Sequence, residues 1–113
     1  MSPRAGSGGR GPARHERPVI DEAALAAART ADRVVAAARE VQADRWVAYF
    51  EAMPDHLRDD EIADLRRTAL KARSAFGPKD SLPDVLPDSV TRPFRDAIDR
   101  LLKELARRDV TGG

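Results

Sequence analysis

The sequence predicts an all-α protein, a small three-helix bundle with a long first helix and a disordered N-terminal tail. Apolar residues recur at the i, i+3 and i+4 spacing of a helix, and no stretch alternates like a strand. Ala, Glu and Arg, which are strong helix formers, are abundant. Pro and Gly gather mainly at the N-terminus and between the predicted helices. With 113 residues, the chain is long enough for one such domain.

Residues 1–18 are the predicted tail, because Gly, Pro and Arg leave this segment little apolar surface to bury. The tail holds four arginines and one glutamate, which gives it a net charge of +3. The whole chain has a net charge of +1, so the remaining residues together carry −2. We expect residues 19–110 to form the helical domain.

The first predicted helix covers residues 21–53, a stretch without Pro or Gly that ends before Pro54. As a single helix it would be about 50 Å long. Its large apolar side chains lie mostly in the C-terminal part, from Trp46 onward. We therefore expect the other helices to pack against residues 34–53, and residues 21–33 to project beyond the core.

The second predicted helix covers residues 60–76. Asp59 is its expected N-cap, and Gly77 followed by Pro78 is the order that favours helix termination. Its apolar face continues without a gap at helical spacing. The residues of this face are Ile62, Leu65, Ala69, Ala72 and Phe76.

The third predicted helix covers residues 89–108, with Asp88 as its expected N-cap. Pro93 is expected in the first turn, where its missing N–H costs little. Residues 77–88 connect the second and third helices, and their apolar side chains are expected to cover the core. These side chains are Leu82, Val85 and Leu86. The expected aromatic centre of the core is Trp46, Phe50, Phe76 and Phe94.

Small residues repeat with a heptad period in the first helix and form a candidate partner interface. They would let another helix approach closely, from a second copy of the chain or from another protein. Alternatively, Ala is simply a good helix former on a solvated surface. Arginines outnumber lysines by 17 to 3, which indicates a GC-rich, and we expect bacterial, genome that supplies Ala freely. The candidate interface residues are Ala24, Ala27, Ala31, Val34, Ala38 and Val41.

Basic residues in the tail and second helix form a weaker candidate interface, for nucleic acid. Against it stands the net negative charge of the remaining chain, because binding to a duplex usually needs a concentrated basic face. The candidate nucleic-acid residues are Arg4, Arg10, Arg14, Arg17, Arg67 and Lys71.

The sequence offers little for catalysis or for a cofactor. It has no Cys, no nucleophile-elbow motif and no phosphate-binding loop. His56 lies near Asp59 and Asp60 at spacings that a metal ion could use, but these acidic residues also suit the start of a helix. We therefore expect no metal, no cofactor, no small-molecule substrate and no enzymatic activity.

No apolar stretch is long enough to span a membrane, and the N-terminus lacks the apolar core of a signal peptide. We expect a cytoplasmic protein without a membrane partner. The predicted function is a non-enzymatic helical protein–protein interaction module, an adaptor or regulatory subunit that binds an unknown protein or itself. The alternative is a small nucleic-acid-associated regulator that uses the Arg-rich tail and the second helix.

Overall fold

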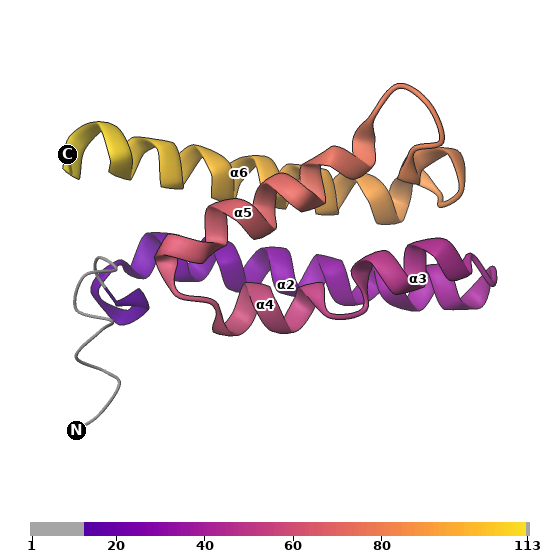
Figure 1. Cartoon of the computed structure of the whole chain (residues 1–113), viewed down its shortest axis with the longest axis horizontal. Coiled ribbons are helices and arrows are strands. Elements are labelled where there is room, and N and C mark those ends of the chain that lie inside the picture. Colours follow the sequence, from indigo (N-terminus) through magenta and orange to yellow (C-terminus); the bar gives the residue numbers. More distant parts are fainter. Residues whose placement is uncertain (1–12, 113) are drawn as a thin grey trace.

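The computed structural model of the chain describes residues 13–112, and the side chains of residues 13–107. These residues form helices and no strand, so the predicted all-α class is confirmed. They are arranged as four rods in up-down-up-down order, which corrects the predicted three-helix bundle (Figure 1). The rods are α2 (Pro18–Glu40), α3 (Asp44–Phe50) in tandem with α4 (Met53–Asp59), α5 (Ile62–Arg73) and α6 (Asp88–Gly112).

The predicted first helix is not continuous, because α2 ends and the chain reverses directly after it. Gln42 adopts a left-handed conformation with a φ of 57°. Its N–H donates to the carbonyl of Arg39 at 3.1 Å, and the N–H of Ala43 donates to the carbonyl of Ala38 at 2.8 Å. These bonds form a Schellman motif, which usually carries Gly at the left-handed position. The prediction of one helix over residues 21–53 is therefore wrong, and the absence of Gly concealed the reversal.

Pro54 begins a helix rather than ending one. It occupies one of the first two positions of α4, where the backbone N–H has no partner within the helix, so its absence in proline costs no helical hydrogen bond. The tandem of α3 and α4 runs back along α2 and presents one continuous apolar face to the core. The residues of this face are Trp46, Phe50, Met53 and Leu57.

Alanine forms the buried face of α2, which α4 and α6 cover. Because these side chains are small, the neighbouring helices can pack at short interaxial distance. Residues 21–33 therefore do not project beyond the core, as their burial and the ion pair between Arg58 of α4 and Asp32 show. The buried alanines are Ala23, Ala24, Ala27, Ala28, Ala31 and Ala38, each at most 1% exposed.

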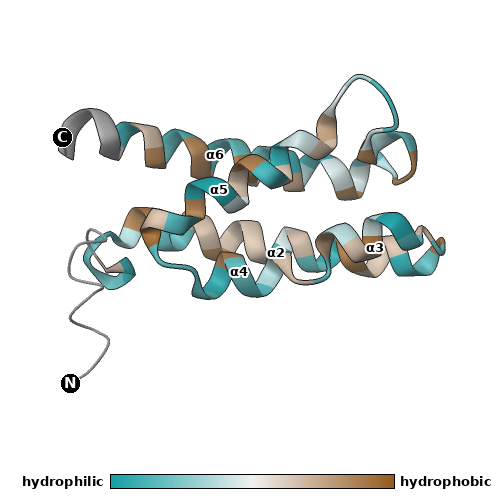
Figure 2. Ribbon diagram, viewed as in Figure 1, coloured by the Kyte–Doolittle hydropathy of each residue, from teal (hydrophilic) through white to brown (hydrophobic). Residues whose placement is uncertain are grey.

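The predicted aromatic centre is present and joins α3 to α6 and to the end of α5. The ring centroids of Trp46 and Phe50 are 5.9 Å apart, and those of Phe50 and Phe94 are 5.4 Å apart. Phe76 lies in the 3-10 turn η3 (Ser74–Phe76) and extends the cluster, with its centroid 6.1 Å from that of Phe94. Figure 2 shows hydrophobic segments recurring along α6 between hydrophilic ones, which is the pattern of a helix buried on one side.

The connector between α5 and α6 covers the core only in part. Leu82, in the 3-10 turn η4 (Leu82–Asp84), and Leu86 are buried, whereas Val85 is 45% exposed. The Ser81 N–H donates to the Asp84 carboxylate at 3.1 Å and fixes this turn. The connector therefore closes one end of the bundle with two of its three apolar side chains.

Several predicted helix boundaries need correction. Glu61 is the N-cap of α5, and Asp59 belongs to α4. The last helix begins at Asp88 and continues to Gly112, beyond the predicted end at residue 108, and Pro93 lies in its second turn. Of the acidic residues near His56, Asp59 is the last residue of α4, and Asp60 lies between α4 and the N-cap of α5.

Part of the predicted tail belongs to the folded structure. Residues 1–12 of it lie outside the described residues. The 3-10 turn η2 (Arg14–Glu16) precedes α2, and Pro18 is the first residue of that helix. The prediction of a disordered segment is therefore corrected for residues 13–18. None of the described helices has the length and apolar character needed to cross a membrane.

Replacing Ala31 with Leu is expected to lower the free energy of unfolding by about 1–3 kcal/mol, because the larger side chain overpacks the space between α2 and its neighbours. Ala36 is exposed on the same helix and provides the matched control, since Ala36→Leu should change stability by less than about 0.5 kcal/mol. Urea unfolding followed by the fluorescence of Trp46, the single tryptophan, measures both. Equal effects of the two substitutions would contradict the close packing of α2.

Candidate functional site: a groove between α4 and α5

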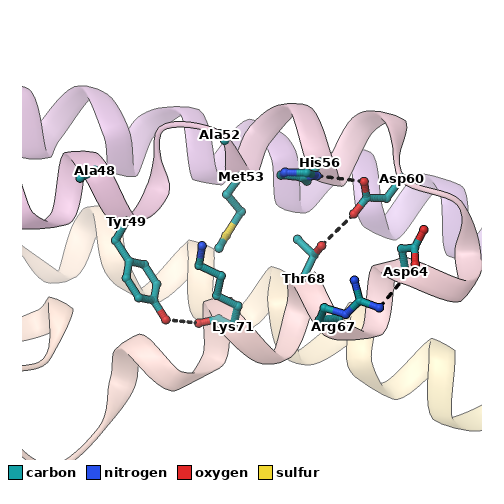
Figure 3. Close-up of a pocket in the computed structure, with 10 residues that line it drawn as sticks. All are labelled: Ala48, Tyr49, Ala52, Met53, His56, Asp60, Asp64, Arg67, Thr68 and Lys71. Carbon is teal, nitrogen blue, oxygen red and sulfur yellow. Dashed lines mark hydrogen bonds and ion pairs between the residues drawn. The ribbon is translucent and has the colours of Figure 1, made fainter.

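A groove of about 680 Å³ opens between the α3–α4 tandem and α5 (Figure 3). One side, which we term the apolar wall, consists of Ala48, Tyr49, Ala52 and Met53. On α5, Arg67 and Lys71 form the opposite side, which we term the cationic wall. The remaining lining residues are His56, Asp60, Asp64 and Thr68.

A tyrosine hydroxyl joins the two walls at one end of the groove. The hydroxyl of Tyr49 donates to the carbonyl of Lys71 at 2.8 Å and lies 2.9 Å from the hydroxyl of Ser74. Figure 3 shows the Tyr49 side chain reaching from α3 across to α5. The Lys71 ammonium lies over the same ring, 5.0 Å from its centroid, so the ring and the cation contact each other.

A carboxylate joins the two walls at the other end. The hydroxyl of Thr68 donates to one oxygen of Asp60 at 2.8 Å, and Nδ1 of His56 donates to the other at 3.0 Å. Asp60 follows α4 directly, in the extended elbow that leads into α5. The hydrogen bonds at both ends therefore hold the walls at a set separation, with the groove between them.

The cations that line the groove are more exposed than its carboxylates. The Arg67 side chain is 84% exposed and forms an ion pair, at 3.8 Å, with Asp64, whose side chain is 31% exposed. Lys71 is exposed and has no carboxylate partner among the described residues. In contrast, the Asp60 side chain is only 18% exposed, and both of its oxygens accept hydrogen bonds.

Arg14, from the segment before α2, fixes the elbow at the acidic end. Its Nη1 donates to the carbonyls of Leu57 and Asp60, at 2.8 and 3.0 Å, and its Nε donates to Asp21 at 2.7 Å. The carbonyl of Leu57 belongs to the last turn of α4, where a cation is favoured by the helix dipole. The side chain is 12% exposed, so the arginine is part of the structural framework behind the groove.

The predicted partner interface lies inside the single chain. Ala24, Ala27, Ala31, Val34 and Ala38 are each 0% exposed, because α4 and α6 cover them. Only Val41 is on the surface, at 52% exposure. The prediction of an external pairing surface is corrected: the small residues pack against helices of their own chain.

The predicted nucleic-acid residues do not form one surface. Arg4 and Arg10 lie outside the described residues, and Arg14 is held in the elbow. Arg17 is exposed beside the start of α2. Of the described candidates, Arg67 and Lys71 are brought together, as neighbours on the cationic wall.

The groove itself was missed by sequence reasoning, which did not single out Tyr49, Met53 or Thr68. The signal was the apolar series from Trp46 to Leu57, which keeps helical spacing through Pro54. That series indicates that helical structure continues past the proline. The continued segment is the one that lies opposite α5 and forms the other side of the groove. Among the described residues, no three His, Asp or Glu side chains are placed to share a metal ion.

Comparison of the chain with protein-family models, with curated proteins and with solved structures finds no match. The interpretation of the groove therefore rests on its geometry and chemistry.

Replacing Arg14 with Met is expected to lower the free energy of unfolding by about 1–3 kcal/mol, because two partly buried carbonyls lose their charged donor. Arg17→Met removes an exposed arginine three residues away and should change stability by less than about 0.5 kcal/mol. Urea unfolding followed by Trp46 fluorescence measures both variants. Two variants as stable as the parent chain would argue against a fixed elbow.

Proposed function

We propose that this chain is a non-enzymatic protein-interaction module, an adaptor or regulatory subunit, and that it binds its partner in the groove between the α3–α4 tandem and α5. The observation that carries the proposal is the pairing of an apolar wall with an exposed cationic wall. Interfaces between proteins commonly combine apolar contact with Tyr, Met and Arg side chains. Self-pairing through the small-residue face is not available, because that face is buried.

The polar groups of the groove support binding rather than catalysis. His56 and Asp60 resemble a base with its orienting carboxylate, but the Thr68 hydroxyl bonds to the carboxylate and not to the imidazole. The imidazole is thus not placed to remove the proton from that hydroxyl. The three residues act together as a hydrogen-bonded link between the walls.

Protein binding is favoured over the nucleic-acid alternative by the distribution of charge. A nucleic-acid strand needs cations that follow its phosphates, whereas the groove offers two cations on one helix. The elbow beyond them, residues 59–61, carries only acidic side chains and so adds no cation along which a strand could continue. Arg14, one of the candidate nucleic-acid residues, is engaged with backbone carbonyls.

A photoreactive phenylalanine analogue at Ala52 tests the proposal in the cells that encode the chain. Ala52 is exposed on the apolar wall, and Ala36, exposed on α2, is the matched control position. We expect a protein to be captured from position 52 and not from position 36. Mass spectrometry identifies the captured protein, which is then purified and titrated against the full chain.

The titration separates a specific interface from chance proximity. Ala52→Gln narrows the groove without adding charge and should weaken binding by about fivefold or more, as expected for a contact inside an interface. Ala36→Gln should leave the dissociation constant unchanged. Capture from both positions alike, or equal affinity of the two Gln variants, would refute the groove as the interface.

A further inference from the structure

The exposed positive charges of the groove lie on one of its two walls. Arg67 and Lys71 lie on one helix four residues apart, about 6 Å along the axis, and thus on the same side. Their charged ends are exposed, whereas the carboxylate of Asp60 is covered and already bonded to His56 and Thr68. A ligand in the groove therefore encounters two exposed cations beside an apolar wall, Arg67 with Asp64 at 3.8 Å and Lys71 without a carboxylate partner among the described residues.

Apolar surface continues on the far side of the cationic wall. Leu70 is 52% exposed and lies directly before Lys71 on α5. It is one of four large apolar side chains exposed among the described residues, and it lies next to the groove rather than in its lining. The cationic wall is thus flanked by apolar surface, with Ala48 and Ala52 across the groove and Leu70 behind it.

We propose that the groove binds an acidic amphipathic segment of a partner protein, with its carboxylates on Arg67 and Lys71 and its apolar side chains against the flanking apolar surface. This inference rests on the proposed function and specifies the partner. The complement of exposed cations is a carboxylate, and the complement of the apolar wall and Leu70 is an apolar side chain. Only a segment that carries both satisfies the groove.

The size of the groove limits how much of the partner it holds. From Ala48 to His56 the lining spans nine residues, or about 12 Å if helical, which corresponds to about two turns of a docked helix. So short a contact, with its charge pairs partly in water, gives weak binding, with a dissociation constant on the order of 100 µM. A single surface contact of this kind suits a partner that binds and dissociates readily.

The test uses the full chain with its lysine amines dimethylated with ¹³C, which preserves their positive charge. The chain has three lysines, Lys71, Lys79 and Lys103, so each gives its own NMR signal and reports on its own surroundings. The probe is a blocked peptide of Leu, Ala and Glu, about 12 residues or roughly 18 Å long as an amphipathic helix. Its counterparts carry Gln or Lys in place of every Glu.

We expect the Glu peptide to shift the Lys71 signal in a saturable manner and to leave the Lys79 and Lys103 signals in place. The Gln and Lys peptides should bind about tenfold more weakly or not at all, because they lack carboxylates. Parallel movement of all three lysine signals would indicate diffuse attraction, and equal binding of the Glu and Gln peptides would indicate apolar contact alone. Either result would overturn the proposal.

Two lysine variants provide the matched comparison. Followed by the NMR signals of the peptide, which every variant allows, Lys71→Glu should weaken binding of the Glu peptide by about tenfold or more. Lys103→Glu, an identical change at an exposed position on α6, should change it by no more than about twofold. Lys71→Gln, which removes the charge without reversing it, should weaken peptide binding by an amount between those of the two Glu variants. Far-UV circular dichroism and Trp46 fluorescence verify that each variant is folded. Equal loss in both Glu variants would contradict the assignment to the groove.

A single-stranded oligonucleotide of about 12 nucleotides tests nucleic acid as the alternative anionic ligand, since it presents phosphates without apolar side chains. Tighter binding of the oligonucleotide at Lys71 than of the Glu peptide would replace the proposal with nucleic-acid recognition. Selective capture at Ala52 combined with no binding of the Glu peptide would retain the interface and reject the acidic partner. Peptide binding without selective capture would reject the proposed function instead.

Discussion

The alanine face of α2 is the constraint on which the rest of the fold depends. Small side chains let two neighbouring rods approach this helix closely, and α4 and α6 are the segments that do so. With that face covered, α5 packs mainly on α6 and α4, outside the central contact. Burial of an alanine side chain removes little apolar area from water. The aromatic cluster of Phe50, Phe76 and Phe94 buries more apolar area per residue and so contributes more to the hydrophobic stabilisation of the core.

The groove is a consequence of this arrangement. On its inner side, α5 packs against α6, and at the surface Arg73 forms an ion pair with Asp99 of α6 at 3.0 Å. On its outer side it meets the α3–α4 tandem through hydrogen bonds made by Tyr49 and Thr68, near the two ends of the groove. Between these points the two walls are not in full contact, so polar and apolar side chains are left facing each other across an open space.

Much of the fold could be predicted from periodicity, because α5, α6 and the aromatic centre rest on regular apolar spacing. The division of the first helix could not, since the reversal places Gln42 where Gly is usual, and Pro54 begins a helix instead of ending one. The burial of the alanines and the groove both follow from that reversal. Arg67 and Lys71 were recognised as cations, but the wall opposite them needed the tertiary structure.

Arg14 shows why the elbow at the acidic end is polar. Apolar contact would bury the junction of α4 and α5 without selecting one angle between the helices, whereas a guanidinium bonded to two carbonyls and a carboxylate fixes direction as well as distance. Lysine has one charged nitrogen and could not make these bonds with the same geometry. Since Asp60 supplies one of those carbonyls and also bonds to His56 and Thr68, the segment before α2 sets the shape of the groove at that end.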